Sequence, residues 1–227
     1  MKNLLFTSTL FLIINFSFAQ TTTDLTKAGL KGKVSFISCS EYKLVEKFGE
    51  IEKGSFYFKD TYKYDEKGNK IESNFYDADG SLSHKVTSKY DEKRNEIEVN
   101  GYYADGSLFY KDTYKYDEKG NKIERNSYYA DGSLSHKVTY KYDEKGYMIE
   151  SNRYNYKGNK GSFDSKDTYK YDEKGNKIES NFYDAEGSLF YKYTYKYEFD
   201  KIGNWIKQTT ITDGKPTELN ERVIEYY

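Results

Sequence analysis

The fold is decided by residues 62–82, which read YKYDEKGNKIESNFYDADGSL. Two short segments of this stretch, Asp65–Gly68 and Asp77–Gly80, begin with Asp and end with Gly. Asp side chains hydrogen-bond to the backbone of a turn, and Gly adopts the left-handed conformation that such turns require. The residues between the two segments lack Gly and Pro and include Ile, Phe and Tyr, as is typical of β-strands. The stretch therefore predicts antiparallel strands joined by tight turns.

The same pattern recurs about every 26 residues along the chain, which is the mark of a tandem repeat. Its Tyr-Asp pair begins at Tyr64, Tyr90, Tyr116, Tyr142 and Tyr171. The sequence thus predicts an all-β fold, an antiparallel meander of tandem β-hairpin repeats, over residues 56–204. We expect residues 20–55 to form lead-in strands. Residues 205–227 are expected to form C-terminal capping strands, because the last units of a repeat array differ from the others.

Alternation of side chains along the strands separates two faces of the expected sheet. Four-residue turns would place Tyr62 opposite Ile71, which gives one aromatic face and one face of Lys, Thr, Glu and Asn. An open sheet of about a dozen strands would leave the aromatic face wet, so we expect a curled or spiral sheet. A spiral, a wide barrel-like roll and a folded-over sandwich remain open. In the second unit Arg94 replaces the turn Gly, and Asn95 is expected to take the left-handed position.

Residues 1–19 have the features of a signal peptide, with Lys2 near the start, an apolar run, and Ala19 at the expected cleavage site. The sequence therefore predicts export to the periplasm, the cell surface or the medium. The mature chain is expected to contain no stable transmembrane segment. One Cys and two His in 227 residues exclude a disulfide framework and a Cys- or His-rich metal site. A net charge of -1 lacks the basic excess of nucleic-acid binders, so no nucleic acid is expected as a partner.

No set of residues has the spacing of an enzyme active site. His84 and His136 stand where other units have aromatic residues, so we expect them to pack. Asp60, Asp112 and Asp167 fall on the aromatic face, where Tyr hydroxyls would satisfy them, or where they would ring a polar lumen. Because no unit stands out from the others, we expect no catalytic residue, no metal and no cofactor.

The polar face carries a row of tyrosines and asparagines that suits an extended ligand. Aromatic rings supply apolar contact area, and amides supply hydrogen-bond donors and acceptors for a sugar or peptide chain. The alternative is a solvated strand face. The predicted ligand-binding residues are Tyr76, Tyr102, Tyr128, Tyr154 and Tyr183, with Asn74, Asn100, Asn126, Asn152 and Asn181.

The Tyr-x-Tyr-Asp-x-x-Gly-Asn pattern of residues 62–69, repeated at 114–121 and 169–176, resembles the YD-repeat (rearrangement-hotspot) family of exported bacterial proteins. The match covers roughly residues 56–204. The resemblance implies a β-sheet that spirals into a hollow shell in a secreted or cell-surface protein, and it implies carbohydrate binding. This chain departs from the family in its small size and in having no recognisable toxin or protease-like segment.

We therefore expect an exported, non-enzymatic β-repeat protein that acts as a binding or scaffolding module at the cell envelope. Its expected partner is a glycan or an envelope protein. One alternative is a purely structural or cell-contact module with a protein partner. The other is an outer-membrane barrel, which requires an apolar outward band that the charged residues of both faces deny.

Overall fold

The computed structural model describes residues 23–227, which form one short helix followed by a long series of strands. The elements are α1 (Asp24–Lys27), β1 (Val34–Lys47), β2 (Glu50–Tyr64), β3 (Lys70–Tyr76), β4 (Leu82–Tyr90), β5 (Glu96–Tyr103), β6 (Leu108–Tyr116), β7 (Lys122–Tyr129), β8 (Leu134–Tyr142), β9 (Met148–Lys157), β10 (Lys160–Tyr171), β11 (Lys177–Tyr183), β12 (Leu189–Phe199), β13 (Trp205–Thr212) and β14 (Lys215–Tyr226).

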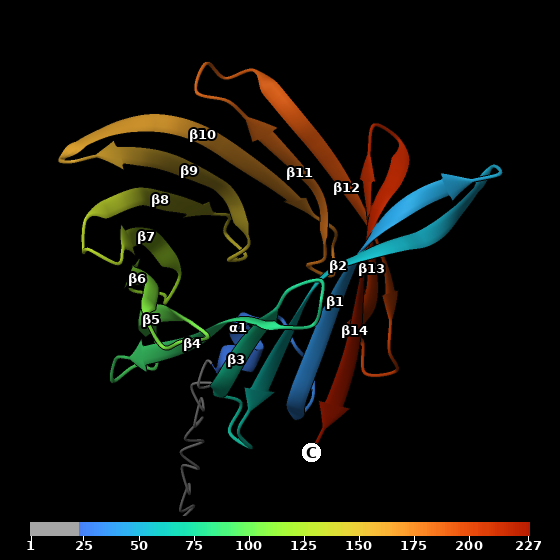
Figure 1. Ribbon diagram of the computed structural model, residues 1–227, viewed down its shortest axis with the longest axis horizontal. Coiled ribbons are helices and arrows are strands. Elements are labelled where there is room, and N and C mark those ends of the chain that lie inside the picture. Colours follow the sequence, from blue (N-terminus) through green and yellow to red (C-terminus); the bar gives the residue numbers. More distant parts are fainter. Residues whose placement is uncertain (1–22) are drawn as a thin grey trace, which may run out of the picture.

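The strands form a closed antiparallel barrel in which sequence neighbours pair all the way round. The closing pair is β1 with β14, whose register runs from Val34 opposite Tyr226 to Lys43 opposite Glu218. The chain colours follow this order, and the red β14 lies beside the blue β1 (Figure 1). The all-β antiparallel meander is confirmed. The spiral sheet is not found, because pairing β1 with β14 leaves the described sheet without an open edge.

Both turns of the first repeat are one residue longer than expected, because Tyr64 pairs with Lys70 and Tyr76 pairs with Leu82. The carboxylate of Asp65 accepts hydrogen bonds from the backbone N–H of Asn69 at 2.9 Å and from Asn69 Nδ2 at 2.7 Å, which holds Asn69 in the turn. A bulge at Ile71 adds a second extra residue, so Tyr62 lies opposite Ser73 and the expected pairing with Ile71 is wrong. Because two residues are added together, Tyr62 and Ser73 still share the predicted face.

The bulge also exchanges two side chains between the faces of the sheet. Ile71, expected on the aromatic face, is 65% exposed, whereas Lys70 lines the lumen. A bulge re-aims the side chains beside it, which alternation alone does not anticipate. The equivalent residues Ile97, Ile123, Ile149 and Ile178 are exposed in the same way.

Arg94 itself adopts the left-handed conformation, with φ of 63°, so the expectation for Asn95 is wrong. The backbone N–H and Nδ2 of Asn95 both donate to the carboxylate of Asp91, at 2.7 and 3.0 Å. Asn95 is therefore held as Asn69 is held in the first repeat, and the left-handed position falls on the residue before it.

Replacing Arg94 by Gly is expected to stabilise the barrel by about 0.5–1 kcal/mol, because relief of left-handed strain outweighs the added entropy of the unfolded chain. Thermal unfolding should show the melting temperature (Tm) rising by about 1–4 °C. The matched control is Gly120→Ala, since Gly120 has φ of 83° and an added Cβ would meet only Asn95 Oδ1, at 3.9 Å. A lower Tm for Arg94→Gly would show that the hydrogen bond from Arg94 Nη1 to Asn69 Oδ1, at 3.2 Å, outweighs the backbone strain.

The buried core lies where the two ends of the sheet meet. Leu25, Val34, Ile37 and Tyr64 form it, and Leu30, Tyr62, Ile224 and Tyr226 pack against it. The helix α1 is tied to the first turn, since Leu25 N donates to Gly68 O at 3.2 Å and Lys70 N donates to Asp24 Oδ2 at 2.7 Å. The segment before β1 therefore closes part of one end of the barrel.

A hydrogen-bonded cluster around Asp200 fastens the β12–β13 turn to β14 and to the segment before β1. The Oδ1 atom of Asp200 accepts three backbone N–H groups of its own turn, at 2.8–2.9 Å, and Oδ2 accepts the hydroxyl of Tyr226. The side chain of Asn204, only 3% exposed, exchanges hydrogen bonds of 2.8 Å with the backbone of Lys31 and donates to Tyr226 Oη. This cluster joins the β12–β13 turn, β14 and the segment before β1.

Candidate binding surfaces

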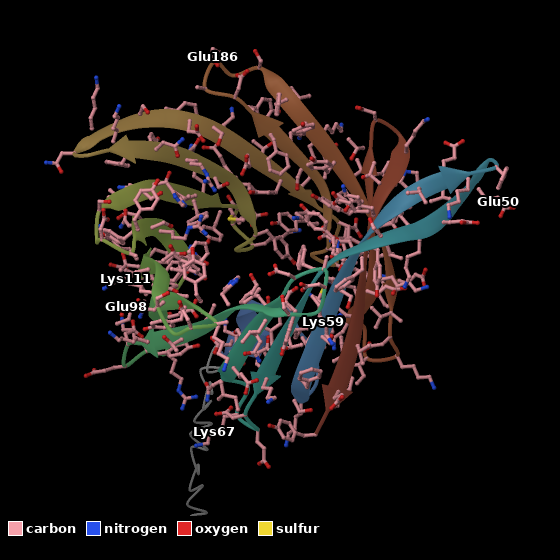
Figure 2. All side chains as sticks on the ribbon, viewed as in Figure 1. Glu50, Lys59, Lys67, Glu98, Lys111 and Glu186 are labelled. Atoms are coloured by element: carbon pink, nitrogen blue, oxygen red, sulfur yellow. The ribbon has the colours of Figure 1, made fainter. Side chains whose placement is uncertain are left out.

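The polar face of the sheet forms the outer wall of the barrel and carries a lattice of ion pairs. Glu98 on β5 pairs with Lys89 on β4 and Lys111 on β6, each at 2.7 Å. Figure 2 shows Glu98 and Lys111 on the outside of these strands. Hydrogen bonds from Lys111, Lys89 and Asn100 lower the pKa of Glu98 to about 2. The arrangement recurs around Glu124 and Glu179.

All ten residues of the predicted binding row lie on this outer wall, on β3, β5, β7, β9 and β11. The Nδ2 atom of each of the five asparagines donates to the Glu two residues before it, at 2.6–3.0 Å. The amides therefore belong to the wall lattice. The five tyrosine rings are partly exposed, and lysines of neighbouring strands face them, as Lys85 faces Tyr102 and Lys111 faces Tyr128. The structure brings these rings into one row around the barrel.

Asp60, Asp112 and Asp167 lie on the lumen side, and each accepts a hydroxyl from a tyrosine two residues further on. The distances are 2.8 Å from Tyr62 to Asp60 and 3.4 Å for the other two pairs. Burial raises the pKa of Asp60, and its Oδ1 atom has no hydrogen-bond partner among the described residues. The predicted Tyr–Asp hydrogen bonds are thus present, and the same carboxylates also line the lumen.

The two histidines pack among lumen side chains. His84 stacks on Phe75 with ring centroids 4.4 Å apart and 5° between the ring planes. His136 Nε2 lies 3.2 Å from a guanidinium nitrogen of Arg125. Burial lowers the pKa of both histidines.

In three repeats the tyrosine of the Tyr-Asp pair ties its repeat to the preceding one. The hydroxyls of Tyr116, Tyr142 and Tyr171 donate to the backbone carbonyls of Glu96, Lys122 and Met148, at 2.7–2.9 Å. These carbonyls belong to the residues that begin β5, β7 and β9, where the ladder is interrupted by a bulge. The Tyr-Asp motif therefore has a structural role in these repeats, because its Asp forms the turn and the hydroxyl of its Tyr bonds the backbone carbonyl at the bulge.

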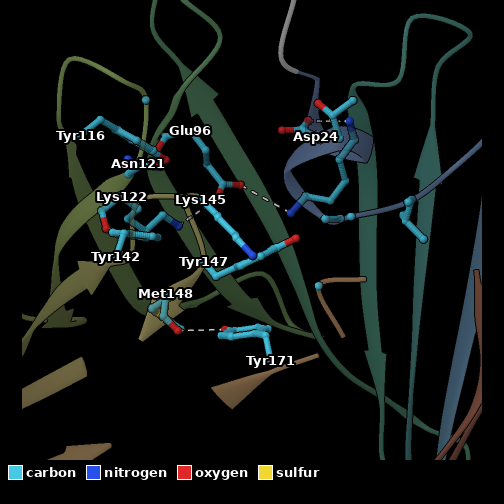
Figure 3. Close-up of a pocket in the computed structure, with 18 of the residues that line it drawn as sticks. Asp24, Glu96, Tyr116, Asn121, Lys122, Tyr142, Lys145, Tyr147, Met148 and Tyr171 are labelled. Carbon is cyan, nitrogen blue, oxygen red and sulfur yellow. Dashed lines mark hydrogen bonds and ion pairs between the residues drawn. The ribbon is translucent and has the colours of Figure 1, made fainter. Parts of the chain in front are cut away.

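A cavity of about 1050 Å³ occupies the lumen at the end where these turns lie. Its lining comes from strands on several sides of the barrel, and Figure 3 shows Glu96, Lys122, Tyr147 and Tyr171 around it. The lining residues that carry charge or an aromatic ring are Asp24, Lys70, Glu96, Lys122, Lys145, Arg222, Tyr62, Tyr64, Tyr116, Tyr142, Tyr147 and Tyr171.

Two ammonium groups share one carboxylate in this cavity. Lys70 Nζ lies 3.6 Å and Lys122 Nζ 4.0 Å from the two oxygens of Glu96. Lys122 Nζ also lies 3.5 Å from the centroid of the Tyr114 ring. Burial lowers the pKa of Lys122 to about 8, although Glu96 opposes the shift. The charged form of Lys122 is therefore costly to bury, and the one carboxylate of Glu96 does not fully neutralise the two lysines.

Sequence reasoning did not identify this cavity. It placed the isoleucines inside, so Lys70, Glu96 and Lys122 were assigned no role. A signal was present, because the residue that begins the second strand of each repeat is Lys70, Glu96, Lys122, Met148 and Lys177 in turn. Such variation within an otherwise uniform array marks the positions where the repeats differ in chemistry.

No protein-family model and no curated protein matches this sequence. Two solved structures resemble the barrel, and each match covers 86% of this chain and 98% of the other chain. One is a porin-like protein from Bacteroides uniformis, with 11% sequence identity and a TM-score of 0.50. The other is a porin-like protein from Bacteroides vulgatus, with 15% identity and a TM-score of 0.50. At these identities the likeness concerns the fold alone. Within residues 23–227 no helix has the length and apolar character needed to cross a membrane.

Proposed function

We propose that this protein is an exported, non-enzymatic binding barrel of the cell envelope that holds a glycan on its outer wall. The observation that supports the proposal is the row of partly exposed rings Tyr76, Tyr102, Tyr128, Tyr154 and Tyr183. Alternate strands lie about 10 Å apart, so the rings repeat along a line. A linear row of equivalent contacts suits an extended chain better than a small substrate, and it has no point at which catalytic groups converge.

Side chains of neighbouring strands support the same proposal by holding two of the rings in place. Lys166 Nζ lies 4.8 Å from the centroid of the Tyr183 ring, and Phe163 contacts Tyr154 edge-on with centroids 5.6 Å apart. A ring fixed by its neighbours loses little conformational entropy when a ligand packs on it. Lysines beside the rings add hydrogen-bond donors for sugar hydroxyls.

The test is a glycan-array and cell-wall polysaccharide pull-down with residues 20–227, comparing the wild type with Tyr102→Ala/Tyr128→Ala. We expect binding by the wild type and a loss of at least tenfold in the variant. The matched control is Tyr103→Ala/Tyr129→Ala, which removes two exposed rings that lie opposite His84 and Tyr110 of the lumen side. Equal binding by all three proteins would exclude the outer row as the site, and binding of an envelope protein alone would favour the scaffolding alternative.

An outer-membrane barrel is the second candidate, favoured by the fold of the porin-like structures. The wall lattice opposes it, since Glu98 and Lys111 would face lipid, where a lysine costs about 2–4 kcal/mol near the midplane and a glutamate somewhat less. We expect residues 20–227 to stay in solution without detergent and not to float with liposomes. Stable flotation would replace the proposal by the membrane alternative.

A further inference from the structure

The fourth repeat differs from the others at the edge of the lumen cavity. Four turns end in Asn followed by a charged residue: Asn69-Lys70, Asn95-Glu96, Asn121-Lys122 and Asn176-Lys177. In the fourth repeat Tyr147 and Met148 occupy these two positions, and both line the cavity. The substitution replaces a polar pair by an aromatic and an apolar side chain at one place in the lumen.

This substitution gives up a hydrogen bond that the other turns make. In those turns the Asn Nδ2 atom donates to the turn Asp at 2.7–3.0 Å. Tyr147 keeps the two hydrogen bonds of its backbone: its N–H donates to Asp143 Oδ1 at 2.8 Å, and its carbonyl accepts from Asp143 N at 2.9 Å. Its ring instead stacks on Tyr171, with centroids 5.0 Å apart and 18° between the planes. Gly175 makes room for it, because an added Cβ would come within 2.5 Å of Tyr147 Oη.

The charge of the cavity is positive, although the chain as a whole carries a net charge of -1. Four of the lining residues are cationic, Lys70, Lys122, Lys145 and Arg222, and two are carboxylates, Asp24 and Glu96. Asp24 is engaged by the backbone N–H of Lys70 and by the hydroxyl of Tyr90. An anionic group entering the cavity would therefore add to the neutralisation of Lys70 and Lys122, which share the carboxylate of Glu96.

We propose that the lumen cavity is a second binding site, which takes an aromatic ring carrying a carboxylate or another anionic group. The ring packs against the Tyr147–Tyr171 pair, and the anion lies beside Lys122. A cavity of about 1050 Å³ is large enough for such a ligand. The site is separate from the outer tyrosine row, and it stands whether or not the outer wall binds a glycan.

The probe for this site is 2-naphthoate, compared with the uncharged 2-naphthylmethanol, and binding is followed by calorimetry with residues 20–227. We expect naphthoate to bind at least tenfold more tightly than the alcohol. Tyr147→Asn restores the residue that the other turns have at this position. It is expected to lower the affinity for naphthoate at least tenfold, while Tm stays the same or rises. Lys122→Gln is expected to abolish the preference for the anion.

The control variant is Tyr102→Ala on the outer wall, which should bind naphthoate as the wild type does. Three results would each overturn the proposal: no saturable naphthoate binding at millimolar concentration, equal affinity for the acid and the alcohol, or unchanged binding by Tyr147→Asn. Because Tyr147→Asn regains a hydrogen bond of the turn, a loss of binding by a variant with undiminished Tm does not reflect misfolding.

Discussion

Raising the pH from 9 to 12 is expected to unfold the barrel, because its lumen is built from tyrosines that must stay protonated. Burial raises the pKa of Tyr64, Tyr142 and Tyr169 to about 12, and that of Tyr62 and Tyr114 further still. In the unfolded chain tyrosine has a pKa of about 10. Above that value the unfolded state binds fewer protons than the folded state, so stability falls as the pH rises.

The size of the effect follows from the same linkage. At pH 11 each tyrosine that stays neutral in the fold favours unfolding by up to about 1.4 kcal/mol, and by less where the ring is partly exposed. Several such tyrosines remove a large part of a stability of about 5–15 kcal/mol. Lys122 has the opposite effect on stability between about pH 8 and 10.5. In that range the folded protein has lost the Lys122 proton while the unfolded chain still binds it, so stability rises with pH. The decline is therefore expected to begin only above about pH 10.

Far-UV circular dichroism and tyrosinate absorbance, recorded along one pH titration, check this prediction. We expect the loss of β-structure and the main rise in tyrosinate to coincide between about pH 10 and 12. Tyr64→Phe is the matched variant, since Tyr64 is only 5% exposed and Phe cannot ionise, and its midpoint should move upward. Full ionisation of the tyrosines with unchanged circular dichroism would contradict the prediction.

Asp200→Ala is expected to destabilise the barrel by about 2–4 kcal/mol and to lower Tm by about 4–16 °C, as measured by thermal unfolding. The substitution removes the acceptor of three backbone N–H groups and of the Tyr226 hydroxyl. It also frees Tyr226, which accepts from Asn204. The cluster that fastens the β12–β13 turn to β14 and to the segment before β1 is lost with it.

The control is Asp172→Ala in an internal repeat. Asp172 accepts two backbone N–H groups and Asn176 Nδ2, all within its own turn. We expect a clearly smaller fall in Tm for this variant. If the two variants melt alike, the cluster around Asp200 contributes nothing beyond an ordinary turn.

The strands and the two faces were predictable from residues 62–82, because turn chemistry and alternation are local properties. Thr61 and Asn74 were assigned to the polar face and Tyr62 and Ser73 to the aromatic one, and the observed register keeps them so. The five-residue turn was not predicted, because the hydrogen bonds from Asn69 to Asp65 that extend it are not visible in alternation. The bulge that follows the turn was not predicted either, and it exchanges the faces on which Lys70 and Ile71 lie.

Closure of the barrel was beyond local reasoning, since it depends on the accumulated twist of every strand pair. The lumen cavity depends on closure in turn, because Lys70 and Lys122 face Tyr171 and Arg222 only once β14 has paired with β1. The outer row of tyrosines needs no closure and was visible in the repeat. Its ligand remains a prediction, because equivalent positions on a wall do not identify what binds there.

The pairing of β1 with β14 also has a kinetic consequence. Every other strand pairing of the described sheet joins chain neighbours through a short turn, so these hairpins can form independently and early. The pairing of Val34 with Tyr226 must wait until the last strand is available, and it carries the entropy cost of closing a loop through nearly the whole chain. Assembly of this barrel is therefore expected to separate into fast, local zipping and one slow final step, with the edges of β1 and β14 open to pairing with other chains until that step is complete.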